Sequence, residues 1–280
     1  MGAAFIRSRG EWFQLLLVCC ALASAARAAP AAAKDFDVPL SGHGHIRSFM
    51  YFDRGPDNWI DTFIGLESEL LRYKRSFLVF RFENETDMGR GADPKMIFDP
   101  NRGRWTFGVG ARTELQKHFL ELLVRHDCHH GIDRWWPGQD YKMTSAGLAF
   151  GTLAYLQKYR YPGDVDGGAS LPLGLAYFVM PTFYLPRGDP WQRQPYLIRL
   201  EANTRIDIFR WSRLGLGLES ANVLYWSDKG QLQRSHALNL DMFLYGDHAA
   251  LLLFAGWWPY DNQVFRNRAG KIVSGLEISF

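Results

Sequence analysis

Apolar and polar side chains alternate along the segment YLIRLEANTRIDIF, residues 196–209. On a strand, one face would carry Ile198, Leu200, Ala202, Thr204, Ile206 and Ile208, and the other Arg199, Glu201, Asn203, Arg205 and Asp207. A period of two is that of a β-strand, because a helix repeats every 3.6 residues. The alternation therefore restricts the chain to β-architectures whose two faces meet different surroundings, one apolar and one polar.

About twelve segments of the chain show this alternation. They lie near 43–53, 58–70, 75–86, 103–115, 117–128, 142–156, 172–185, 195–209, 212–226, 234–246, 248–258 and 271–280. An even number of such segments is typical of a closed antiparallel transmembrane barrel. Closure is needed because backbone groups at an open sheet edge have no water to bond in a bilayer. The sequence predicts an all-β fold, a transmembrane β-barrel of about 12 strands.

The lengths of the connections support the barrel. With both termini in the periplasm, the connections 71–74, 115–117, 209–212 and 245–248 would be periplasmic and short, while 87–102, 129–141 and 259–270 would be external and long. Short periplasmic turns and longer outer loops are the usual asymmetry of these barrels. Two connections depart from it, since 54–57 is short on the outer side and 157–171 is long on the inner side.

The N-terminus reads as a secretory signal peptide. Arg7 and Arg9 precede the apolar run LLLVCCALASA and the small residues ARAAP. We therefore expect a signal peptide at 1–29, an N-terminal periplasmic segment at 30–42 and the barrel at 43–280. The net charge of +3 falls to about +1 without the signal peptide, which leaves no basic excess for nucleic acid.

The C-terminal segment KIVSGLEISF places Ile272, Leu276, Ile278 and Phe280 on one face. It resembles the last strand of bacterial outer-membrane barrels, whose terminal aromatic residue belongs to the assembly signal. The resemblance implies location in the outer membrane of a diderm bacterium, with partners that include its lipid and lipopolysaccharide and the barrel assembly machinery. Aromatic residues make up 15% of the chain, as interfacial girdles require.

Two alternatives stay open for the architecture and its lumen. A soluble barrel or sandwich would turn the apolar faces inward, but it would leave Phe280 without a purpose and place Arg199 and Arg205 outside. Within a transmembrane barrel, charges of both signs would face the lumen, which suits internal ion pairs. A plugged lumen therefore competes with a small-solute, porin-like channel.

A cluster of chemically active residues lies in LLVRHDCHHGID, residues 122–133. Leu122 and Val124 have the parity expected of the lipid face, and His126 and Cys128 continue that row. Asp140, across the next loop, has the same parity as lipid-facing residues of the following strand. A nucleophile, a base two residues before it and a polar group on the adjacent strand form a generalised catalytic triad.

This hairpin looks like that of outer-membrane phospholipase A and lipid A deacylase barrels, in which a His-x-Ser pair faces lipid and a polar residue about a dozen positions later completes the site. The resemblance implies a lipid acyl hydrolase of the outer leaflet, with His126 as base, Cys128 in the place of the serine and Asp140 as the orienting group. Cysteine replaces serine, and His129 replaces the asparagine that follows it. The hairpin is also similar to a His-x-Ser-x-His pattern of uncharacterised outer-membrane barrels, here His126, Cys128 and His130.

Two further readings of the cluster stay open. His126, Cys128 and His130 could ligate zinc together with Asp133 or Asp140, although their spacing is not a recognised zinc signature. The cluster could also be a structural, non-catalytic polar rim at the membrane interface, where histidine and tryptophan are common. The sequence identifies no cofactor, and it does not fix the substrate or the oligomeric state.

Overall fold

Twelve long strands form the barrel. The structure, a computed structural model, describes residues 36–39, 41–55, 58–89, 99–131, 141–157, 174–186, 196–263 and 268–280. The barrel strands are β2 (Ser41–Gly55), β3 (Asn58–Tyr73), β4 (Ser76–Gly89), β5 (Asp99–Leu115), β6 (His118–Gly131), β7 (Tyr141–Thr152), β8 (Gly174–Tyr184), β9 (Tyr196–Trp211), β10 (Leu214–Ser227), β11 (Leu232–Tyr245), β12 (Ala250–Asp261) and β13 (Ile272–Ser279). Each predicted segment overlaps one of these strands.

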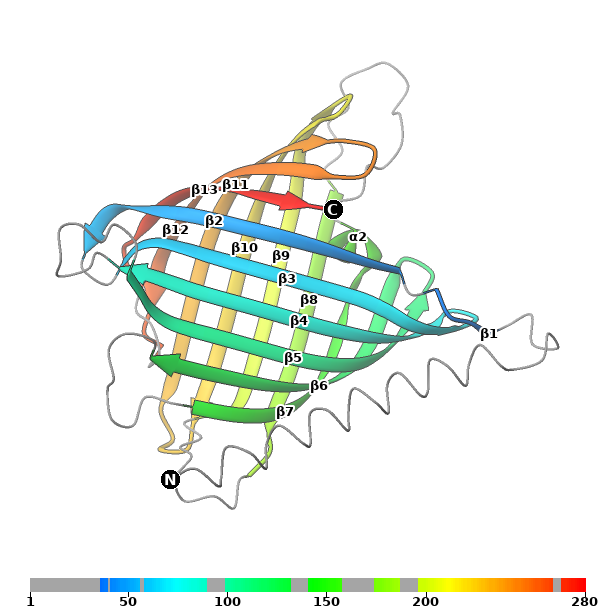
Figure 1. Cartoon of the computed structure of the whole chain (residues 1–280), viewed down its shortest axis with the longest axis horizontal. Coiled ribbons are helices and arrows are strands. Elements are labelled where there is room, and N and C mark those ends of the chain that lie inside the picture. The colour runs from blue at the N-terminus through cyan, green and yellow to red at the C-terminus, as the bar shows by residue number, and fades with distance from the viewer. Residues whose placement is uncertain are drawn as a thin grey trace.

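The sheet closes on itself. From β2 to β13, consecutive strands pair antiparallel, and β13 pairs with β2 to complete the ring (Figure 1). Phe280 extends this seam, because its backbone N–H and C=O both bond to Gly44 at 2.9 and 2.7 Å. The short strand β1 (Phe36–Asp37) pairs with the end of β3, beyond the start of β2. The prediction of a closed antiparallel barrel of about 12 strands is confirmed.

The connections follow the expected asymmetry. Residues 74–75, 116–117, 212–213 and 246–249 form short connections at one end, which that asymmetry makes the periplasmic end. Both predicted exceptions remain, since 56–57 is short and 153–173 is long. Most strand ends differ from the prediction by a few residues. One predicted strand end has a different structure: residues 153–156 form the helical turn α2 (Leu153–Leu156). The predicted signal peptide lies outside the described residues, and the first barrel strand begins two residues before the predicted 43.

The two faces of the wall differ as the alternation predicts. On β6, Leu122 is 55% exposed on the outer surface, while the neighbouring Glu121 is fully buried in the lumen. Leucine, isoleucine, valine and aromatic side chains are exposed around the outside of the barrel. A wall that is apolar outside and charged inside suits a barrel surrounded by lipid. Among the described residues, no helix has the length and apolar character needed to cross a bilayer.

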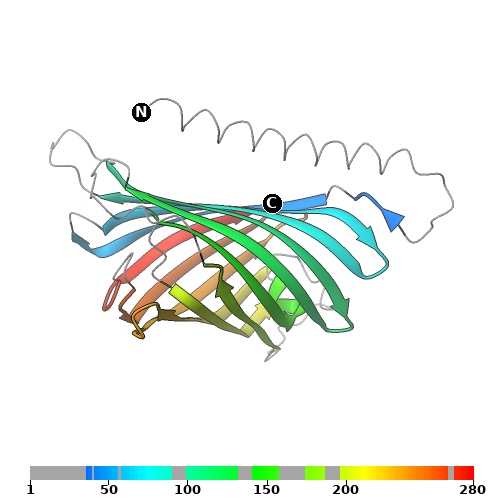
Figure 2. The ribbon, with the colours of Figure 1, turned by 90° about the horizontal axis from the view of Figure 1, so that it is seen from below.

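The lumen is filled more by aromatic and apolar groups than the sequence indicated. Phe119, Leu123 and Phe178 face inward and are buried, together with Ala149 and Met180. The side chains of α2 pack against them, so α2 lies inside the barrel at its periplasmic end (Figures 1 and 2). A barrel of this size can be spanned by side chains, and inward apolar residues can therefore pack together instead of meeting water.

Candidate functional site

β6 carries the predicted site on its outer half. Its burial alternates, with Arg125 and Asp127 buried inside and His126 and Cys128 partly exposed on the opposite face. His126 and Cys128 continue the row of the lipid-facing Leu122, as the sequence predicted. Two residues along a strand rise about 6.6 Å, so side chains at these positions can approach each other. The structure thus places both side chains on the outer face of the wall, two residues apart along β6.

A residue that the sequence analysis missed holds the imidazole of His126. His126 lies in register with Thr144 of β7, and its Nδ1 is 3.0 Å from the Thr144 Oγ1. A hydrogen bond at Nδ1 fixes the orientation of a histidine ring and helps to set its tautomer. Thr144 shares the outward parity of β7, and this parity is the signal that could have indicated it.

Cys128 lies between an aromatic residue and a cation. Its cross-strand partners are Trp105 on β5 and Lys142 on β7. Beside it, the outer surface forms a groove lined by Trp105, Phe107, Cys128 and His130. The ring of His130 lies 5.5 Å from that of Trp105, centroid to centroid. The groove is aromatic on the β5 side, and Lys142 brings a positive charge to the other side of the thiol.

The remaining predicted site residues cannot be placed. Asp140 and Asp133 lie outside the described residues. Within the described part of the chain, no group of three or more His, Cys, Asp or Glu side chains is arranged to hold a metal ion. The zinc reading, which needed His126, Cys128 and His130 with one of these aspartates, gains no support from the described residues.

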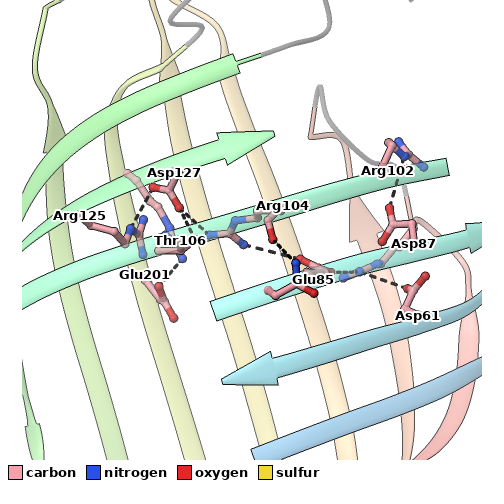
Figure 3. A network of polar contacts seen from close by, with 12 residues as sticks. Asp61, Glu85, Asp87, Arg102, Arg104, Thr106, Arg125, Asp127 and Glu201 are labelled. Atoms are coloured by element: carbon pink, nitrogen blue, oxygen red, sulfur yellow. Dashed lines mark hydrogen bonds and ion pairs between the residues drawn. The ribbon is translucent and has the colours of Figure 1, made fainter. Parts of the chain in front are cut away.

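A buried ionic network supports this part of the wall from the lumen side. Asp127, between His126 and Cys128 in the sequence, accepts hydrogen bonds from Thr106 Oγ1 at 2.7 Å, Arg104 at 3.1 Å and Arg125 at 3.0 Å (Figure 3). The three donors come from β5 and β6. These bonds fix the backbone of β6 at the residue that separates the two outward side chains, which favours a rigid site.

The network continues to the outer loop that follows β12. Arg268 of this loop donates to Glu85 at 2.6 Å and lies 3.4 Å from Asp61. Its guanidinium also stacks over Trp258, 4.9 Å from the ring centroid. A loop residue thus reaches into the lumen and ties β12 to β3 and β4 at the outer end.

A second ionic cluster lies on the lumen face of the neighbouring strands β3, β4, β5 and β6, nearer the periplasm. Arg81 contacts Glu67 at 2.6 Å and Glu121 at 2.9 Å, and Arg112 contacts the same two carboxylates at 2.7 and 2.8 Å. Below it, α2 contributes a hydrogen bond of 3.0 Å between Tyr155 and Asn203. Between these layers and the outer end lies a cavity of about 490 Å³. The predicted mixture of internal charges is confirmed, and the charges are paired across strands.

Solved structures with this architecture are outer-membrane proteins. Outer membrane phospholipase A from Escherichia coli is similar at 8% identity, with 85% of this chain and 89% of that chain covered and a TM-score of 0.50. The Salmonella typhi outer membrane phospholipase, solved as a dimer with bound calcium, shows 9% identity, coverage of 87% and 93% and a TM-score of 0.51. LpxR from Salmonella typhimurium shows 9% identity, coverage of 86% and 99% and a TM-score of 0.47.

Comparison by sequence gives no further assignment. No protein-family model matches the chain, and no curated protein matches it significantly. At such low identity, likeness to the two phospholipase structures concerns the fold alone. The closed ring, the apolar outer surface and this likeness agree that the chain has the fold of a 12-strand outer-membrane β-barrel.

Proposed function

We propose that this protein is a lipid acyl hydrolase that acts on the outer-membrane lipid around it, with His126, Cys128 and Asp140 as its catalytic residues. The observation that carries the proposal is the outward position of His126 and Cys128 together with the 3.0 Å contact between His126 Nδ1 and Thr144. His126 has its Nδ1 held by Thr144, and the thiol of Cys128 lies two residues further along the same face. A base and a thiol in this arrangement meet the requirements of nucleophilic catalysis. Asp140, which directly precedes β7 in the sequence, is proposed as a second orienting group.

The chemistry assigns a step to each group. In the working tautomer, the Nδ1–H of His126 donates to Thr144 and Nε2 takes the proton of the Cys128 thiol. The thiolate attacks the carbonyl carbon of an acyl ester, and the imidazolium returns its proton to the departing alcohol oxygen. Water then cleaves the acyl thioester, aided by the same imidazole, and releases a fatty acid.

The surroundings of Cys128 suit a lipid substrate. An acyl chain can lie in the groove along Trp105 and Phe107, where apolar contact replaces contact with membrane lipid. Lys142, the cross-strand partner of Cys128, can stabilise negative charge that develops during attack. The named neighbours in structure include two outer membrane phospholipases, which provides a precedent for lipid hydrolysis on this architecture and no more than that.

The channel alternative fits the lumen less well. Ion pairs line its wall between neighbouring strands, and α2 packs inside its periplasmic end, where Tyr155 bonds to Asn203 of β9. An open pore would need these groups to leave a continuous water-filled path. A structural barrel with a polar rim would share the same lumen, so the lipid-facing residues must be tested directly.

The test measures fatty acid release from phospholipid and from lipid A by the purified, folded barrel. Cys128→Ala should abolish release, and Cys128→Ser should retain part of it because serine restores a hydroxyl nucleophile. His126→Ala should be nearly as severe, since members of one catalytic unit do not contribute additively. Thr144→Val and Asp140→Asn should be milder, because they remove an orienting group and leave the base in place.

The matched control is Val124→Ala, which alters the same outward row two residues before His126 and leaves the proposed site intact. A folded wild-type barrel that releases no fatty acid from either lipid would refute the hydrolase. Release that is unchanged in Cys128→Ala would refute the site. Either result would favour the alternative interpretation, in which the cluster is a structural, non-catalytic polar rim.

A further inference from the structure

A second polar cluster faces the lipid on a different wall of the barrel. It consists of Ser220 and Asn222 on β10 and His236 on β11, and we call it the β10–β11 cluster. These residues share their outward parity with the exposed Leu218, Leu224 and Leu238. β10 lies four strands round the ring from β6, and with β9 and β11 it forms the rear wall in Figure 1. The cluster is therefore separate from the proposed hydrolase site.

Hydrogen bonds join the cluster into one unit. His236 Nδ1 lies 2.5 Å from Asn222 Oδ1. The Asn222 amide nitrogen donates to Ser220 Oγ at 3.0 Å and to the backbone oxygen of Ala202 at 3.0 Å. Asn222 thus has a structural duty, since it satisfies a carbonyl of β9. That duty does not account for Ser220 or His236, whose polar groups have a cost against hydrocarbon.

Ser220 keeps one hydrogen-bonding function for a ligand. Its oxygen accepts from Asn222, so its hydroxyl hydrogen remains available as a donor. His236 holds Asn222, and Asn222 in turn holds Ser220, which fixes the hydroxyl in place. A donor fixed at a lipid-facing position suits an acceptor that the membrane itself supplies, such as an ester carbonyl.

A cation lies next to the cluster, on the side nearer the outer end of the barrel. Arg234 precedes His236 by two residues on the same face of β11, and its guanidinium lies 4.0 Å from the ring centroid of Tyr260. Tyr260 is also the cross-strand partner of His236. An arginine stacked on an aromatic ring at the membrane interface is well placed to bind a phosphate. Along β11, Arg234 stands about 6.6 Å from His236 and about 13 Å from the level of Ser220.

We infer that this wall binds a glycerophospholipid molecule in a fixed position. Arg234 binds its phosphate, and the Ser220 hydroxyl donates to an ester carbonyl below. The acyl chains then lie along Leu218 and Leu240, an exposed cross-strand pair further from the interface than Ser220. From the interface inward, Arg234 comes before Ser220, which is the order of the phosphate and the ester groups in such a lipid. The site binds lipid and carries out no reaction on it.

Native mass spectrometry of the full barrel in detergent tests the inference, with phosphatidylglycerol and diacylglycerol as probes. All variants carry Cys128→Ala, so that hydrolysis at β6 cannot change the ligand. The wild-type wall should bind phosphatidylglycerol more tightly than diacylglycerol, which lacks the phosphate. Arg234→Gln should weaken phosphatidylglycerol binding about tenfold and leave diacylglycerol binding unchanged. Ser220→Ala should weaken both.

The control is Thr62→Val, which removes a lipid-facing hydroxyl of β3 and should change neither affinity. Equal binding of the two lipids to the wild-type wall, or an unchanged preference in Arg234→Gln, would overturn the inference. Unaltered binding in Ser220→Ala would overturn the ester contact. A barrel that is dimeric and becomes monomeric in these variants would assign the cluster to a second copy instead. None of these results depends on whether the β6 site is catalytic.

Discussion

Removal of a single carboxylate from the second ionic cluster, which consists of Glu67, Arg81, Arg112 and Glu121, should destabilise the barrel far more than removal of an exposed carboxylate. Glu121 is fully buried and accepts hydrogen bonds from Arg81 at 2.9 Å and Arg112 at 2.8 Å. Glu121→Gln keeps the size of the side chain and removes its charge. Two arginines then share Glu67 alone, so one positive charge in the lumen loses its counterion.

The magnitude follows from this burial. Removing one partner of a buried ion pair costs about 3–5 kcal/mol, because the charge left behind has been taken out of water. The comparison is Asp247→Asn, which breaks the 2.6 Å pair with Arg213 at the periplasmic end, where the side chains are 68% and 51% exposed. An exposed pair is worth about 0.2–1 kcal/mol. The two variants should therefore differ by roughly 2–5 kcal/mol in the free energy of unfolding.

Reversible unfolding in urea, with the barrel folded into lipid vesicles, measures both variants, and heat-modifiable migration on gels confirms that each is folded beforehand. If Glu121→Gln and Asp247→Asn lose equal stability, the inward assignment of β6 is wrong, and the lipid-facing assignment of His126 and Cys128 is wrong with it. The loss of stability relative to the wild type should depend on salt concentration for Asp247→Asn but not for Glu121→Gln, since ions screen exposed pairs more strongly than buried ones.

Three other predictions concern the wall and the lumen. Gly275→Ala should cost about 1–3 kcal/mol, because an added Cβ would lie 2.3 Å from the backbone oxygen of Ser48, whereas Gly215→Ala, whose Cβ would lie 3.3 Å from the Tyr245 ring, should cost much less in the same unfolding assay. Leu122→Arg should lower stability in vesicles by about 2–4 kcal/mol if the residue lies near the bilayer midplane, and an unchanged value would contradict lipid contact. The wild-type barrel should show no steady porin-like conductance in planar bilayers, and a stable open current would restore the channel reading.

Strand number and the two faces of the wall could be read from the sequence because alternation is a local property. A strand turns successive side chains to opposite sides, so Glu121 and Leu122 are separated by parity alone. The same parity placed His126 and Cys128 on the lipid side. The end of β7 was the exception, since residues 153–156 form α2 and pack against Phe119 and Phe178 inside the lumen. That contact joins segments distant in the chain, and alternation carries no information about it.

The sequence by itself determined that the chain is a barrel of about 12 strands, which residues face lipid, and that a His-x-Cys pair lies among them. Only the tertiary structure decided which groups meet across strands, because the register of each pair and the closure of the ring set those neighbours. Register places Thr144 against His126 and Tyr260 against His236. Closure lets Arg268 reach Glu85 across the outer end, 183 residues away in the chain. The alternation assigns a side chain to one face of the sheet. Its neighbours on that face come from other strands, and the register of those strands decides which residues they are.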